Sequence, residues 1–205
     1  MGQHLEEAKK HLASRCDVMA DLIDRYIPPA INPEPPERYF DVLVSSIIGQ
    51  QLSVKAADTI EARLRAAVSD FRPSILQEMD PASMKEHGLS GAKATYIQSL
   101  AQSFHDGQID PHELAKLDND DVHAKLTALK GVGPWTAEMF LIFGMGRPDV
   151  WSPGDLALRR TVGTFFGESA DLAEVSNRWR PYRSYASLYL WRYSDEGAGA
   201  QKAVV

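Results

Sequence analysis

The stretch LKGVGPWTA, residues 129–137, places two glycines and a proline between two segments of helical character. Gly131 stands where a helix commonly ends in a left-handed residue, and Pro134 stands in the first turn of the next helix, where its missing N–H is not needed. The pattern predicts a helix–hairpin–helix in which Gly131 and Gly133 let another backbone approach closely. The positive end of the second helix is suited to a phosphate diester. An ordinary turn between packed helices remains the alternative.

A carboxylate follows at the start of another predicted helix. The residues Ser152-Pro153-Gly154 predict a turn that delivers Asp155 to the N-terminus of a helix running to about Phe166. By itself, an aspartate in that position predicts a helix cap.

The rest of the chain supplies the helices that must position these residues. Apolar residues recur at helical spacing through the first segment, and five prolines between Ile27 and Glu37 predict a loop. Sustained alternation typical of strands is missing from the pattern, so we expect an all-α fold. The expected helices cover residues 5–23, 38–51, 53–68, 91–107, 118–129, 135–143, 156–166, 172–177 and 182–193, with further starts at Asp80 and Asp110.

Composition narrows the class of protein. Cys16 is the single cysteine, and the six histidines show no spacing typical of metal ligands, so we expect neither a disulfide nor a transition-metal site. The apolar runs are too short to span a membrane, and the N-terminus lacks the apolar core of a signal peptide, which predicts a cytoplasmic protein. The net charge is −6, but residues 130–192 hold eight basic against six acidic residues. That distribution suits either a solvated face or a nucleic-acid contact.

Taken together, the hairpin, the following Gly/Pro turn and Asp155 resemble the HhH-GPD superfamily of DNA base-excision glycosylases. SIIGQQLSVKAA at 46–57, LKGVGPWTA at 129–137 and RPYRSYASLYLW at 180–191 resemble its 3-methyladenine DNA glycosylase II (AlkA/MAG) branch. The resemblance covers about residues 39–193. It implies two helical lobes with an active-site cleft between them. One lobe is residues 40–144, and the other combines residues 1–39 with 145–205. Within a bacterial cell, such a protein would be associated with the nucleoid.

The activity implied is that of a monofunctional glycosylase. Such an enzyme flips an alkylated purine, 3-methyladenine or 7-methylguanine, out of double-stranded DNA and hydrolyses its N-glycosidic bond. Asp155, at the positive end of a helix, would stabilise the positive charge on the sugar or orient the attacking water. We expect it to work as a monomer without a cofactor or an iron–sulfur cluster. The base pocket implied by the resemblance comprises Trp135, Trp151, Tyr182, Met139, Leu156 and Tyr39. Met139 and Leu156 stand where aromatic residues are expected, and Trp179 and Trp191 are expected in the core.

The resemblance also implies a set of DNA contacts. The side chain that fills the place of the extruded base is Gln51, or Leu52 if the alignment shifts by one residue. The remaining contacts implied are Lys130, Gly131, Val132, Gly133, Thr136 and Arg159. The carbonyl groups of Leu129 and Gly131 are the expected ligands for a monovalent cation, Na⁺ or K⁺, at the hairpin.

Two other functions stay open. A bifunctional glycosylase/lyase acting on oxidised bases needs a lysine just after the hairpin, and that position is Trp135, which cannot form an imine. The nearest lysine, Lys130, precedes the hairpin. A DNA-binding module without catalytic activity is the other alternative, and Asp155 at its expected place argues against it.

Overall fold

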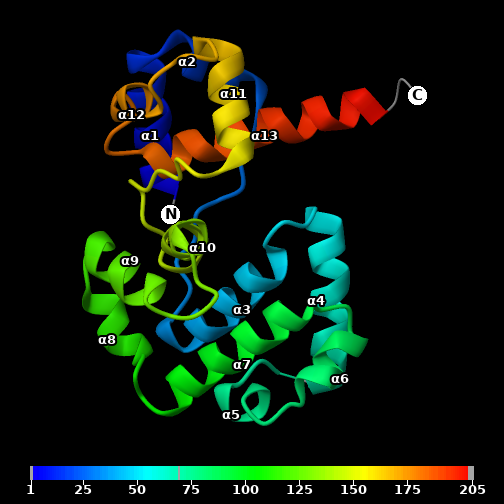
Figure 1. Cartoon of the computed structure of the whole chain (residues 1–205). Helices are drawn as coiled ribbons and strands as arrows, with labels where there is room; N and C mark the ends of the chain where they lie inside the picture. Colours follow the sequence, from blue (N-terminus) through cyan, green and yellow to red (C-terminus); the bar gives the residue numbers. More distant parts are fainter. Residues whose placement is uncertain (1, 69, 203–205) are drawn as a thin grey trace. The chain divides into compact units, whose positions relative to one another are not determined.

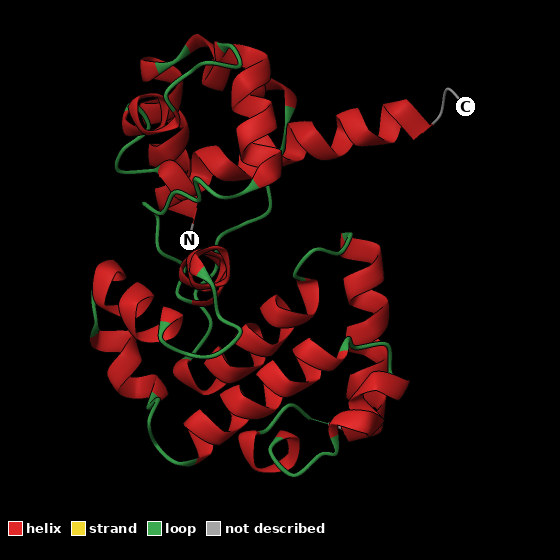
Figure 2. Ribbon diagram, viewed as in Figure 1, coloured by secondary structure: helices red, strands yellow, loops and turns green. Residues whose placement is uncertain are grey.

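The computed structural model describes residues 2–68 and 70–202, and within those ranges every regular element is a helix (Figure 2). The all-α prediction is therefore confirmed. The chain divides into two compact units. One contains the described residues of Pro33–Met145, and the other contains those of Met1–Asn32 and Gly146–Val205. Compared with the expected lobes, residues 33–39 and Met145 fall in the middle unit.

The middle unit is built around α3 (Tyr39–Gly49), which follows the short 3₁₀ helix η1 (Pro36–Arg38). Helix α3 packs against α4 (Val54–Val68), α7 (Gly91–His105), α10 (Pro134–Met139) and the π-helical turn η2 (Phe140–Gly144). The other helices of this unit are α5 (Pro73–Leu76), α6 (Pro81–Glu86), α8 (Pro111–Lys116) and α9 (Asn119–Thr127), labelled in Figure 1. Helix α3 is apolar along most of its length, so it can bury side chains against neighbours on several sides.

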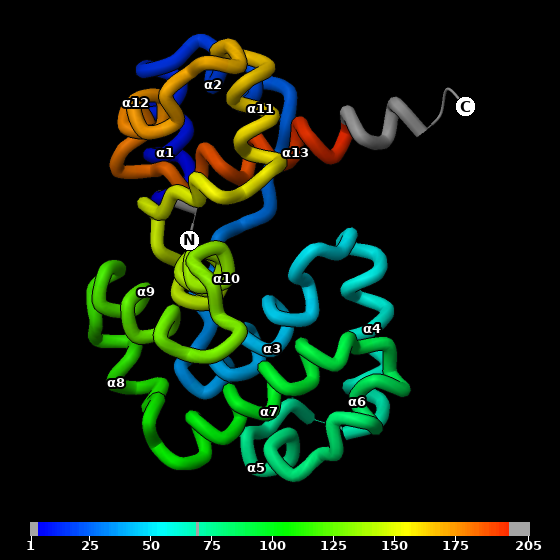
Figure 3. The backbone as a smooth tube through the Cα atoms, viewed as in Figure 1, coloured from blue at the N-terminus to red at the C-terminus, as the bar shows by residue number. Residues whose placement is uncertain are grey.

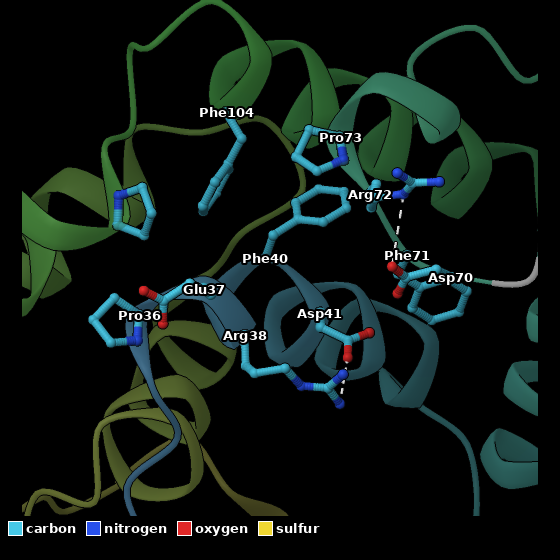
Figure 4. Close-up of a pocket in the computed structure, with 11 residues that line it drawn as sticks. Pro36, Glu37, Arg38, Phe40, Asp41, Asp70, Phe71, Arg72, Pro73 and Phe104 are labelled. Atoms are coloured by element: carbon cyan, nitrogen blue, oxygen red, sulfur yellow. Dashed lines mark ion pairs between the residues drawn. The ribbon is translucent and has the colours of Figure 1, made fainter.

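Asp41 is the charged residue of α3 that the apolar environment must accommodate. It is 5% exposed. Arg65 of α4 donates to its Oδ1 at 2.7 Å, and Arg38 lies 2.5 Å from its Oδ2. Figure 4 shows the Arg38 pair beside the pocket where Phe40, Phe71 and Phe104 gather. The two arginines neutralise a carboxylate whose burial alone would be costly.

The other unit contains α1 (Gly2–Arg15), α2 (Asp17–Arg25), α11 (Leu156–Phe166), α12 (Leu172–Asn177) and α13 (Arg183–Lys202). The tube in Figure 3 shows that residues from both ends of the sequence form it. Helix α13 packs against α11, α2 and α1. Their shared core includes Leu12, Met19, Leu22, Trp179 and Tyr189, all 0% exposed.

Local sequence signals explain where the helices begin. Aspartate side chains accept hydrogen bonds from backbone N–H groups in the first turn, which satisfies donors that have no partner inside the helix. Both predicted Asp-Pro starts, at Asp80 and Asp110, are confirmed. Three further aspartate caps are Asp118, Asp155 and Asp171.

Candidate functional site

The predicted helix–hairpin–helix is present between α9 and α10. Helix α9 ends at Thr127, the chain turns through residues 128–133, and α10 begins at Pro134. Gly131 has φ +86°, the left-handed conformation that a side chain disfavours. The N–H of Val132 donates to the carbonyl oxygen of Leu129 at 3.2 Å, which closes the turn.

The two hairpin glycines have different roles. A Cβ atom on Gly131 would lie 2.1 Å from Cγ of Tyr96, so this glycine makes room for a ring of its own unit. Around Gly133, the same atom would meet nothing within 4 Å. The expectation that both glycines keep space for another molecule is therefore wrong for Gly131. Gly133 alone is open to an approaching backbone.

Other residues of the predicted DNA-binding set differ in exposure. Lys130 of the hairpin and Arg159 of α11 are exposed. In contrast, Val132 and Thr136 are 3% and 2% exposed, so their side chains belong to the interior of the middle unit. Thr136 Oγ1 accepts a hydrogen bond from Gln50 Nε2 at 2.9 Å. The Thr136 hydroxyl thus links the start of α10 to Gln50 within the middle unit.

The loop after α3 is tied to the hairpin and to α7. Gln50 Nε2 also donates to the carbonyl oxygen of Gly131 at 2.9 Å. Lys93 of α7 donates from Nζ to the carbonyl oxygens of Ile48 and Gln50, both at 2.7 Å. Desolvation lowers the pKa of this ammonium group from its usual value. Of the described residues other than glycine, Gln51 alone has a positive φ, +58°.

A cavity of about 540 Å³ opens beside this loop in the middle unit. Trp135 and Met139 of α10 line it, so the structure brings together two of the predicted base-pocket residues. Leu52 and Val54 of the loop region line it too. Because Leu52 faces this cavity while Gln51 does not line it, the two candidates for the inserted side chain occupy different surroundings.

The other predicted pocket residues are not among those that line that cavity. Tyr39 is 5% exposed and packs edge-on against Phe140, with 5.0 Å between ring centroids. Trp151 stacks edge-on with Trp179 at 5.5 Å. Tyr182 lies 5.3 Å from the ring of His11, and Leu156, the first residue of α11, is 63% exposed. The last three residues belong to the unit that also holds Asp155.

Asp155 lies at the N-terminus of α11 and is 9% exposed. Its Oδ1 accepts from the backbone N–H of Leu158 at 2.9 Å, which is the predicted cap. The same oxygen accepts from the indole N–H of Trp191, on α13, at 3.1 Å. A capping aspartate needs no second donor from a distant helix. The arrangement fixes the carboxylate in one orientation at the positive end of α11.

The segment that leads to Asp155 is fastened to the start of α13. Arg183 donates from Nε to Oδ1 of Asp149 at 2.7 Å. Ser184 Oγ donates to the carbonyl oxygen of Arg147 at 2.7 Å and accepts from the N–H of Val150 at 2.9 Å. These contacts explain why the RPYRSYASLYLW motif accompanies the carboxylate: it supplies both the anchor at Arg183 and Ser184 and the donor at Trp191.

Three residues hold predicted site residues in place, and this role was not predicted from the sequence. Trp191 was expected in the core, yet its indole N–H holds Asp155. Gln50 and Lys93, which hold the loop after α3, were not singled out from the sequence. The signal for Trp191 is its position eight residues after Arg183 on one helix, because residues separated by about two turns share a helix face.

Neither a metal centre nor a membrane span is visible in residues 2–68 and 70–202: no three His, Cys, Asp or Glu residues are grouped as ligands, and no helix is long and apolar enough to cross a bilayer. At the predicted monovalent-cation position, the Leu129 oxygen accepts from Val132 and the Gly131 oxygen accepts from Gln50. Each carbonyl has a second lone pair, and the cation stays a prediction.

Comparison with known proteins adds to this geometry. Residues 44–180 match the model of the HhH-GPD superfamily of base excision DNA repair proteins. The chain belongs to this superfamily. The match includes the loop after α3, the hairpin and Asp155, whereas Trp191 lies beyond it.

Individual members of the superfamily are similar over most of the chain. DNA-3-methyladenine glycosidase from Bacillus halodurans is 32% identical, with a TM-score of 0.76 over 94% of this chain and 91% of that one. The Schizosaccharomyces pombe 3-methyladenine DNA glycosylase Mag1, solved with abasic DNA, is 28% identical, with a TM-score of 0.84 over 92% and 97%. A Saccharomyces cerevisiae DNA-3-methyladenine glycosylase is 34% identical over 78% of this chain, which spans 59% of that relative.

Proposed function

We propose that this protein is a monofunctional DNA glycosylase that removes alkylated purines, 3-methyladenine and 7-methylguanine, from double-stranded DNA. It acts as a monomer and begins base excision repair by hydrolysing the N-glycosidic bond. The observation that carries this proposal is the Asp155 carboxylate. Oδ1 of this carboxylate accepts from one backbone and one side-chain donor, in a chain of this superfamily that also contains the helix–hairpin–helix.

The reaction needs little from the protein at the leaving group. In a nucleotide alkylated at N3 or N7, the purine already carries a positive charge, so it departs as a neutral base when the bond to C1′ breaks. Positive charge then develops on the sugar, and Asp155 stabilises it electrostatically. Water adds to C1′ and loses its proton, which yields an abasic sugar, the free base and one proton.

The residues around the hairpin suit this hydrolytic course. Trp135 follows the hairpin directly and offers an aromatic wall that attracts a cationic base. An indole cannot attack C1′ and form an imine, so no covalent intermediate forms at that position. Met139 lines the same cavity at a position where an aromatic residue is expected, and it offers the base a flexible side chain instead of a planar ring. The substrate range is therefore set by charge on the base more than by stacking on both sides.

Defined duplexes test this proposal. Each carries one lesion, either 7-methylguanine, 8-oxoguanine or thymine glycol, and methylated genomic DNA supplies 3-methyladenine. We expect release of the two methylated purines, followed by strand cleavage only after treatment with alkali. Release confined to 8-oxoguanine or thymine glycol would contradict the proposed substrate.

Borohydride distinguishes hydrolysis from lyase chemistry. The wild-type protein is incubated with an intact lesion-bearing duplex in the presence of borohydride, which traps an imine between a lysine and the sugar. We expect no covalent complex. A trapped band that disappears when one lysine is replaced would assign the protein to the bifunctional enzymes instead.

A further inference from the structure

The loop of residues 50–53, which we call the insertion loop, is held from two directions. From one side, Gln50 Nε2 reaches the hairpin at the Gly131 carbonyl and Thr136 Oγ1. From the other side, the Lys93 ammonium group donates to the carbonyl oxygens of Ile48 and Gln50. The end of α3 and the insertion loop are therefore joined to the hairpin, α10 and α7 through four hydrogen bonds contributed by two side chains.

The backbone of the insertion loop has a conformation that needs such support. Gln51 has φ +58°, a left-handed conformation that is unfavourable for a residue with a Cβ. Leu52 and Val54 are 39% and 73% exposed, so burial of apolar side chains does little to fix the segment. The ammonium group of Lys93 lies at the C-terminal end of α3, where carbonyl groups have no helical partners and a cation is favoured.

The Lys93 ammonium group is partly desolvated, which is unfavourable for a charged group. Removing the ammonium group from water lowers its pKa, so the contacts with the two carbonyls must offset part of this desolvation. A lysine that served only to stabilise α7 would keep its charged end in solvent, as long basic side chains usually do. Here the charged end points instead at the carbonyls of Ile48 and Gln50, which closely precede the exposed Gln51 in sequence.

We propose that Lys93 is a positioning residue that fixes Gln51 in the orientation needed to replace an extruded base. This inference rests on the proposed function. Gln50 connects the same loop to the hairpin, so the Gln51 backbone is set before DNA is bound. Holding the inserting side chain in advance lowers the cost of base extrusion, because no loop ordering remains to be done at that step.

The experiment compares Lys93→Met with wild type on two substrates that differ in whether extrusion must break a base pair. One is 7-methylguanine paired with cytosine, and the other is the same lesion opposite an abasic site. Single-turnover excision is measured with the protein in excess. We expect Lys93→Met to lose about tenfold on the paired lesion and less than threefold on the unpaired one. Lys85→Met, which removes an exposed lysine of α6, serves as the matched control and should change neither rate.

A double-mutant cycle separates positioning from general stability. Gln51→Gly removes the inserting side chain and accepts the positive φ. In that background, Lys93→Met should leave the ratio of paired to unpaired excision unchanged, since its effect acts through Gln51. A further tenfold loss in the double variant, or equal losses on both substrates for Lys93→Met alone, would overturn the proposal.

An inactive wild-type protein and an unfolded Lys93→Met variant can each be told apart from the outcomes above. If wild type excises neither lesion, the proposed function fails before Lys93 is tested, and 2-aminopurine fluorescence beside the lesion then reports extrusion directly. If circular dichroism shows that Lys93→Met is unfolded, Lys93→Gln replaces it, because an amide still donates to one carbonyl. The same selective loss, of smaller size, is expected, and its absence would overturn the proposal.

Discussion

Replacing Asp155 with Asn removes a charge while leaving the local structure in place. The amide oxygen of Asn can occupy the position of Oδ1 and accept from Leu158 N–H and Trp191 Nε1, the two donors now at 2.9 and 3.1 Å. Asn and Asp are nearly equal as helix caps. We therefore expect the free energy of unfolding to change by about 0.5 kcal/mol or less.

The effect on the reaction should be much larger. A unit charge about 4 Å from the developing cation, at an effective dielectric constant of about 20, contributes about 4 kcal/mol. Asp155 is 9% exposed, which keeps bulk water from screening this interaction fully. A loss of about 4 kcal/mol from the transition state corresponds to a rate about a thousandfold lower.

Single-turnover excision of 7-methylguanine from a defined duplex measures this loss, and duplex affinity is measured at the same salt concentration. Asp155→Asn should bind DNA like wild type because the hairpin is unchanged. An excision rate within tenfold of wild type, with the fold intact by circular dichroism, would remove the Asp155 charge from the mechanism.

Trp191→Phe tests how the carboxylate is held. It keeps an aromatic ring but removes the N–H that donates to Asp155, and hydrogen bonds to charged groups contribute about 1.5–3 kcal/mol. We expect excision to fall by about tenfold or more while DNA affinity is kept. Trp179→Phe is the matched control, because the indole nitrogen of Trp179 is buried without a hydrogen-bond partner in the described part of the chain. Equal losses in both variants would indicate a packing role for Trp191.

Two further predictions concern the hairpin and the core. Gly131→Ala should destabilise the fold by about 3 kcal/mol, measured by urea unfolding, because its Cβ collides with Tyr96 at a positive φ. Gly133→Val should leave stability nearly unchanged yet weaken duplex binding at matched salt. Unaltered affinity would mean that the hairpin is purely structural. Burial raises the pKa of Tyr189 to about 12, so the folded state keeps this proton when the unfolded chain loses it, and the free energy of unfolding should fall as pH rises from about 10 towards 12. Tyr189→Phe should reduce this pH dependence of the free energy of unfolding. It should also raise stability by about 1 kcal/mol, because the buried hydroxyl oxygen has no hydrogen-bond partner among the described residues. A pH dependence equal to that of wild type would show that Tyr189 is not its source.

Much of the fold follows from local sequence signals. Helical periodicity, the Asp-Pro starts and the glycine at the end of α9 are determined by interactions within a few residues, so the helices and the hairpin could be predicted. The boundary between the units could not be predicted from such local signals. Residues 33–39 pack with the middle unit, and Glu34 N–H donates to the carbonyl oxygen of Gly144 at 2.8 Å, a contact 110 residues away in sequence.

The sequence by itself determined which residue types are available for chemistry. It contains an aspartate at a helix start, a hairpin with two glycines and a tryptophan in place of a lysine, and these depend on no distant contact. Local spacing cannot reveal which side chain lies against which, because that is decided by how helices pack. Only the tertiary structure brought Trp191 to Asp155, Lys93 to the end of α3 and Tyr96 against Gly131. Each of these pairs joins residues at least 35 positions apart, so packing gave these three residues roles that their local sequence does not contain.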